Sequence, residues 1–301
     1  MQRRRIGESG LEVGWLGLAP APLLRHPDEL GLAVDALLDA GGDLISVSTV
    51  ASERSSWSGL ADLLTDTGRR RRCRLNVRSD AVTRGTLLSE LDGALGTLDV
   101  DAVDLWTLTA WADSWEELAT AANVALASGR VHYVAVALPH AWQDVLVASA
   151  IRSGPPGARV AAIAAPYSLV DRTAETDLMP ATRALGAGFI AGAPLGHGIL
   201  TGKYRHGTPP DSRGASESHG PTIRRLLDGT GRHVIDGVAA AAEGLATSPA
   251  TVALAWLRDA PDVSAVVASA RTIHQWRGLL GSDGVVLPQE IRSALNDVSA
   301  A

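Results

Sequence analysis

The chain has 301 residues, and its 27 basic and 33 acidic side chains give a formal net charge of −6, which argues against nucleic acid as a partner. Hydrophobic residues make up 46% and charged residues 20%, a composition typical of a globular domain with a core and unlike that of a disordered chain. The single cysteine, Cys73, excludes an intramolecular disulfide, and no apolar run reaches the roughly 18 residues that span a bilayer, so we expect a cytoplasmic protein that is not a membrane protein.

The first predicted element is a β-hairpin at the N-terminus. Residues 3–6 and 11–13 flank Glu8-Ser9-Gly10, and the glycine suits a tight turn between two short strands. We expect this hairpin to close the floor of a larger structure.

Beyond the hairpin, short apolar runs alternate with amphipathic stretches of ten to fifteen residues, the pattern of βα units and a parallel sheet. Pro27 and Ser248-Pro249 are typical helix starts, and Gly41 and Gly129 are typical helix ends. The predicted strands are 15–18, 44–48, 74–77, 102–108, 133–137, 160–165, 188–191 and 264–268. Eight such units favour an α/β fold of the (β/α)₈ TIM-barrel type, one domain over residues 1–301.

Two segments fall outside this pattern. Residues 205–221 are rich in Gly, Pro, Ser and His, which predicts a long flexible loop after the seventh strand, on the face where barrel active sites lie. The sequence leaves open whether this loop is a lid or is disordered. The basic run Arg69–Arg72 is interpreted as a solvated loop before the third strand.

Several local strings resemble the aldo-keto reductase superfamily in the order that the superfamily has them. The strings are Gly10–Val13, Asp101–Trp106, Ser128–Val136, Pro166–Arg172 and Pro194–Tyr204, the last being the most specific. The resemblance covers nearly the whole chain and implies the same barrel.

The resemblance also implies carbonyl reduction with NADP(H) by an Asp, Tyr, Lys and His tetrad at the ends of the second, third and fourth strands. The matching positions here are Ser46, Ala51, Arg78 and Thr109. Lys203, the only lysine, belongs to the loop after the seventh strand, and no tyrosine lies near the second strand. The tetrad is therefore expected to be absent, and with it the usual proton donor.

The resemblance implies a cofactor site that is kept only in part. The cofactor-compatible positions are Pro194, Leu195, Gly196, Lys203, Ser269 and Arg271. Gly192 stands where the family has an aromatic ring on the nicotinamide, and Ala137-Leu138 and Ala164 replace polar residues that bind the carboxamide. Whether NADP(H) binds is left open.

Arg78 is the main candidate for a new role. With Ser46 and Thr109 at the barrel mouth it could bind an anionic small molecule, or it could form an internal ion pair with Asp43 or Asp80.

Two histidines, His140 and His197, follow strands on the same face and could act as a replacement acid or base, or be ordinary loop residues. No His-x-His or His-Glu-x-x-His spacing appears, so no metal is expected.

Two functions remain open from the residues. One is a degenerate family member, a pseudoenzyme that binds or regulates, or an enzyme repurposed to other chemistry. The alternative is an NADP(H)-dependent oxidoreductase that uses other residues, such as Arg78 or His140. The sequence predicts neither a substrate nor an oligomeric state.

Overall fold

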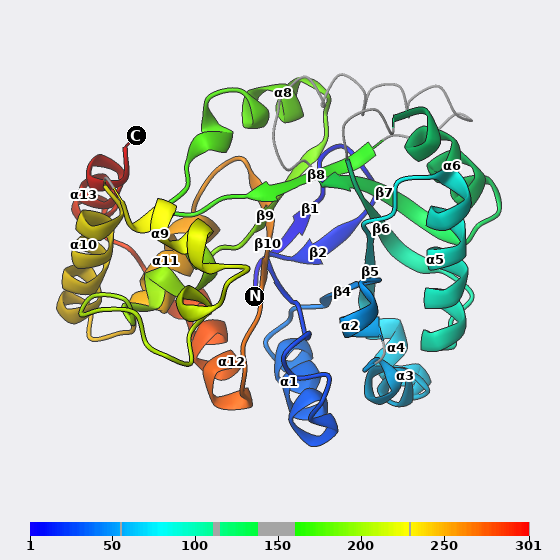
Figure 1. Ribbon diagram of the computed structural model, residues 1–301, viewed down its shortest axis with the longest axis horizontal. Helices are drawn as coiled ribbons and strands as arrows, with labels where there is room; N and C mark the ends of the chain where they lie inside the picture. The colour runs from blue at the N-terminus through cyan, green and yellow to red at the C-terminus, as the bar shows by residue number, and fades with distance from the viewer. Residues whose placement is uncertain (55, 111–114, 138–159, 229, 301) are drawn as a thin grey trace.

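The computed structural model describes residues 1–54, 56–110, 115–137, 160–228 and 230–300, and its centre is a closed barrel of parallel strands (Figure 1). The strand β10 pairs with both β9 and β3, which closes the sheet. The barrel strands are β3 (Leu16–Leu18), β4 (Leu44–Ser48), β5 (Arg74–Ser79), β6 (Val103–Thr109), β7 (Val131–Ala137), β8 (Val160–Pro166), β9 (Gly188–Gly192) and β10 (Val263–Ala268). The predicted (β/α)₈ barrel is confirmed, with each predicted strand within two residues of its bounds.

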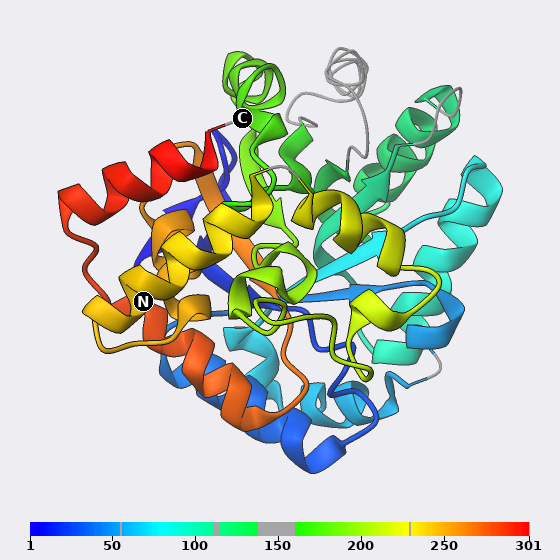
Figure 2. The same ribbon diagram turned by 60° about the vertical axis from the view of Figure 1, so that its left-hand side comes forward.

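Helices follow the strands and form an outer layer around the barrel (Figure 2). They are α1 (Pro27–Asp39), α2 (Ala51–Arg54), α3 (Ser58–Leu64), α4 (Thr67–Arg72), α5 (Arg84–Leu98), α6 (Trp115–Ala127), α8 (Leu178–Ala184), α9 (Gly220–Leu227), α10 (Gly231–Gly244), α11 (Pro249–Arg258), α12 (Ile273–Leu280) and α13 (Gln289–Ser299). Short 3₁₀ turns lie at η2 (Thr173–Glu175), η3 (Gly196–Thr201), η4 (Arg213–Ala215) and η5 (Gly281–Gly284).

The N-terminal hairpin closes the barrel floor, as expected. Its strands β1 (Arg3–Arg5) and β2 (Glu12–Gly14) are antiparallel, and buried Ile6, Leu11 and Val13 pack against apolar side chains that point into the barrel. The turn fits tightly, because a Cβ at Gly7 would lie 2.4 Å from the backbone nitrogen of Gly188. The open end of the barrel is therefore the opposite one, where the strands end.

Side chains alternate along each strand between the barrel interior and the helix layer. On β6, Trp106 is fully buried and its indole nitrogen donates to Ser79 Oγ at 3.0 Å. The neighbouring Thr107 and Thr109 face the interior instead. Trp106 is thus a core residue, and it supports the strand that carries the two threonines.

The predicted solvated loop at Arg69–Arg72 is wrong, because these residues form the end of helix α4. Asp66 begins this helix by accepting hydrogen bonds from the backbone of Gly68 and Arg69. Arg69 then pairs with Asp35 on α1 at 2.9 Å, and Arg70 donates to the Ala102 carbonyl at 3.1 Å. Composition alone suggested solvation, whereas acidic and carbonyl acceptors on neighbouring elements order the run.

The segment 205–221 lies on the predicted face but is shorter as a loop than expected. It contains the turn η4, and α9 already begins at Gly220, with Pro221 in its first turn. The hydroxyl of Tyr204 accepts a hydrogen bond from Gly214 N at 3.0 Å, which holds the loop against the chain that precedes it.

Among the described residues, no single helix is long and apolar enough to cross a membrane. One pair bent by 97°, Gly231–Gly244 with Pro249–Arg258, passes that test together on length and composition alone.

Candidate functional site

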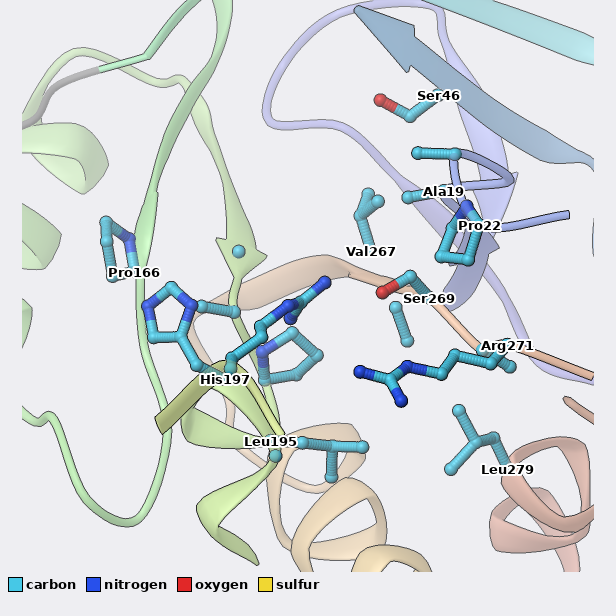
Figure 3. Close-up of a pocket in the computed structure, with 18 of the residues that line it drawn as sticks. Ala19, Pro22, Ser46, Pro166, Leu195, His197, Val267, Ser269, Arg271 and Leu279 are labelled. Carbon is cyan, nitrogen blue, oxygen red and sulfur yellow. The ribbon is translucent and has the colours of Figure 1, made fainter. Parts of the chain in front are cut away.

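A cavity of about 1010 Å³ lies at the carboxyl ends of the barrel strands. It is lined from β4 round to β10, and by the loops after β9 and β10 (Figure 3). Figure 3 shows Ser46 at one end and Leu195 and Leu279 at the other, with the Arg271 side chain extending into the space between. The cavity is large enough for a cofactor or a drug-sized ligand.

One wall of the cavity is polar and is built from three neighbouring strands. The Asn76 amide donates to Ser46 Oγ at 2.9 Å and accepts from Thr107 Oγ1 at 2.7 Å. These bonds join β4, β5 and β6 below the barrel mouth. The wall therefore presents fixed hydroxyl and amide groups to whatever binds there.

Above this layer, Arg78 is held by two neighbours. Its Nε and Nη2 donate to Asp80 Oδ1 at 3.1 and 2.9 Å, and Nε also lies 3.1 Å from Thr109 Oγ1. The Thr109 hydroxyl donates to the same Asp80 oxygen. The guanidinium still lines the cavity, and 47% of its side chain is exposed, so the ion pair orients Arg78 without removing it from the cavity.

Arg78, Ser46 and Thr109 were expected to converge, and the structure places all three on one cavity wall. Arg78 and Thr109 are in contact, whereas Ser46 bonds one layer deeper, to Asn76. The alternative of an ion pair is also present, with Asp80. Asp43 is not the partner, because it pairs with Arg3 at 2.9 Å.

Glu53 on α2 adds a carboxyl group to the same wall. Its Oε1 accepts a hydrogen bond from Ser48 N at 2.9 Å. Burial raises the pKa of this carboxyl, against the lowering effect of the Ser48 N–H and of Arg78.

The opposite wall is apolar, and most of its side chains are small. It consists of Ala137, Ala164, Ile190, Gly192 and Val267. A Cβ at Gly192 would have its nearest neighbour, the Ala165 carbonyl oxygen, at 3.5 Å, so the position has room and no side chain. None of these five side chains can bind a carboxamide.

Cations gather at the far end of the cavity. Lys203, Arg213 and Arg271 line it from three separate segments, together with the hydroxyls of Ser269 and Ser248. Arg271 Nη2 also donates to the Asp211 carbonyl at 3.3 Å, which ties the loop after β9 to the end of β10. This donor set suits phosphate oxygens.

The loop from Ala193 to Gly202 that borders this end has a strained backbone. Ala193 and His197 adopt φ values of 46° and 56°, in the left-handed region that non-glycine residues avoid. At Gly198 an added Cβ would lie 2.8 Å from Lys203 Nζ, so the glycine allows the ammonium to lie over the backbone. Such conformations concentrate at ligand sites, which agrees with a binding role for this loop.

His197 faces the cavity from the same loop, as expected for a residue after β9. Burial lowers its pKa, and the positive charges of Arg213, His219 and Arg225 act in the same direction. Its imidazole is therefore held in the neutral form at neutral pH.

The other predicted site residues have these places. Pro194, Leu195, Lys203, Ser269 and Arg271 line the cavity, and Gly196 lies in the loop between lining residues. Ala51 is the first residue of α2, and His140 lies outside the described residues. No group of three or more metal-ligating side chains exists among the described residues.

The sequence analysis missed Glu53 and Arg213. Neither lies at the end of a strand, where the pattern directs attention, and both enter the cavity from short helical turns. The available sequence signal for Glu53 was its position, because it lies two residues after Ala51, which matches a tetrad position of the family.

A family model described as "Aldo/keto reductase family" matches residues 26–300. The chain is 29% identical to the "Uncharacterized oxidoreductase YrpG" of Bacillus subtilis over 218 residues, which cover 69% of this chain and 62% of that protein. It is 25% identical to "Protein tas" of Escherichia coli over 351 aligned positions, covering 99% and 97%.

A shorter match, 38% identical over 112 residues, is to a "Probable voltage-gated potassium channel subunit beta" of Oryza sativa, covering 36% of this chain and 34% of that one. The matched regions thus span less than two thirds of the Bacillus and Oryza proteins.

Proposed function

Because this chain belongs to the aldo/keto reductase family, we propose that its cavity binds a phosphate-bearing small molecule, with NADP(H) as first candidate, and does not perform conventional carbonyl reduction. The observation that carries the proposal is the contrast between the two ends of the cavity. One end keeps a cationic donor set. The other has Arg78, Asp80 and Thr109 bonded to one another where the resemblance places reactive groups of the tetrad.

The cationic end fits the phosphates of a dinucleotide. Lys203, Arg213 and Arg271 would hold phosphate oxygens, and Ser269 would add a hydroxyl donor. NADPH, when bound, supplies a hydride. The chain's own part at this end is to bind and orient an anion.

The nicotinamide end fits less well. Ala137, Ala164 and Gly192 offer neither a ring to stack on nor a polar side chain to orient a carboxamide. These residues do not fit a nicotinamide in position for hydride transfer, and we propose that the bound molecule is held chiefly by its phosphates.

The absent proton donor supports the same conclusion. In the family a tyrosine donates the proton and a lysine lowers its pKa, whereas Ala51 and Arg78 occupy those positions in the resemblance. Among the described residues that line the cavity there is no tyrosine. Losing a general acid costs about 10² to 10⁴ in rate. A guanidinium stays protonated and cannot replace it.

A calorimetric titration with NADPH tests the proposal. We expect binding in the micromolar range, and we expect no NADPH oxidation above the buffer rate with aldehydes or quinones. Failure to bind at millimolar NADPH would remove the first candidate ligand. Rapid oxidation of NADPH would instead establish the alternative, a reductase with unconventional residues.

A further inference from the structure

Glu53 lies where it can act on a bound molecule. It lines the cavity, and its Oε1 is fixed by the Ser48 backbone at 2.9 Å. None of the described residues donates a hydrogen bond to the other oxygen, Oε2. The carboxyl is therefore oriented by one oxygen and available at the other.

Arg78 is the cation whose charge acts on the pKa of this carboxyl. Ser48, which holds Glu53, is the residue directly across from Arg78 in the register of β4 and β5. Neighbouring strands lie about 4.8 Å apart. Arg78 and the Glu53 carboxyl that Ser48 holds therefore enter the cavity from adjacent positions. Arg78 and Asp80 are also the two charges that act on the pKa of Glu53, in opposite directions.

Arg78 has donors left for a ligand. Asp80 and Thr109 take Nε and Nη2, and no described residue accepts a hydrogen bond from Nη1. An arginine that is oriented on one side and free on the other can bind a carboxylate in a fixed position.

The free side of Arg78 can bind one carboxylate, and Glu53 can act as a base beside it. Arg78 offsets Asp80, and Glu53 adds a single further carboxyl whose pKa burial raises. A carboxylate with a raised pKa is a stronger base than an exposed one and is better matched to neutral pH.

We propose that Glu53 is a general base for proton transfer at the carbon next to the carbonyl of a 2-oxo acid whose carboxylate binds Arg78. The C–H bond breaks and its proton moves to Glu53 Oε2. The electron pair forms a carbon–carbon double bond, and the carbonyl electrons move to oxygen to give an enolate. Return of a proton from Glu53 restores the 2-oxo acid, so the step needs no oxidant or reductant.

The polar wall suits this step, because Arg78 and the hydroxyl of Ser46 can stabilise the charge that develops on oxygen. The activity goes beyond the proposed ligand binding and does not depend on NADP(H). It would make the protein a repurposed enzyme, one of the two outcomes that the sequence left open.

The test is exchange of the C3 protons of 2-oxobutyrate with D₂O, followed by proton NMR. The wild type should accelerate exchange in proportion to its concentration, and the rate should rise with pH as Glu53 ionises. Glu53→Gln, which keeps an acceptor for Ser48 N–H, should slow exchange by about 100-fold or more while 2-oxobutyrate still binds. Arg78→Ala should lose binding of the probe.

Glu243→Gln, on the exposed face of α10, makes the same chemical change away from the cavity and should exchange like the wild type. Thermal unfolding of each variant checks that it is folded, and Glu53→Asp, which keeps a carboxylate, should retain more activity than Glu53→Gln. Wild-type exchange no faster than buffer, or undiminished exchange by a folded Glu53→Gln, overturns the proposal. NADPH titration of the same samples reports separately on the proposed function, since Glu53 is not among the residues proposed to hold the phosphates.

Discussion

Replacing Lys203 by methionine and Arg271 by leucine together should weaken NADPH binding by a factor of about 10² to 10⁴, because each lost charge-assisted hydrogen bond costs about 1.5 to 3 kcal/mol. The two side chains reach the cavity from different segments, Lys203 after η3 and Arg271 after β10. They are therefore expected to bind the ligand from two sides, and loss of both leaves Arg213 as the remaining arginine or lysine at this end among the described residues. Calorimetry at fixed ionic strength measures the change.

A matched control separates a local effect from a change in net charge. Arg277→Leu removes a positive charge from the exposed side of α12, close in sequence to Arg271 but outside the cavity lining. It should bind NADPH like the wild type. Arg271→Lys keeps the charge and should lose less affinity than Arg271→Leu, which also removes the bond to the Asp211 carbonyl. Wild-type affinity in the double variant would show that the phosphates do not bind here.

The barrel was predictable because its signals are local and repeated. Each strand is a short apolar run, and helix starts such as Pro27 and Pro249 stand where the structure has them. The hairpin was predictable for the same reason, since its glycine turn lies between two short strands. The basic run at Arg69–Arg72 was mispredicted because its acceptors, Asp35 and the Ala102 carbonyl, come from other parts of the chain.

The positions of site residues could be predicted only for residues on the barrel strands, because strand order decides which of them are neighbours. Ser46, Arg78 and Thr109 lie on the neighbouring strands β4, β5 and β6, so their position on one wall follows from the barrel. The partner of Arg78 does not follow. Asp80 lies two residues from Arg78 and Asp43 directly precedes the neighbouring strand β4, and only the folded chain places Asp43 beside Arg3. Glu53 shows the same limit, since its carboxyl acquires a role only through burial and the neighbouring β5.

Replacing Trp106 by alanine should lower the free energy of unfolding by about 3 to 5 kcal/mol, the usual cost of removing a buried tryptophan. The side chain is fully buried, and its indole bonds to Ser79 Oγ, which is itself fully buried and would lose its partner. This is a large part of the roughly 5 to 15 kcal/mol that stabilises most domains. Urea unfolding measures it, and a loss below about 1 kcal/mol would contradict the packing described.

Trp106→Phe provides the informative comparison, because it keeps most of the apolar volume while it removes the hydrogen bond to Ser79. We expect it to cost less than the alanine variant and to leave NADPH affinity unchanged, since Trp106 faces the helix layer and not the cavity. The adjacent Thr107 and Thr109 face the polar wall, so a shift of β6 would move the partner of Arg78. Proton exchange should therefore fall in Trp106→Phe only if the strand itself moves, which ties the geometry of the polar wall to the packing behind it.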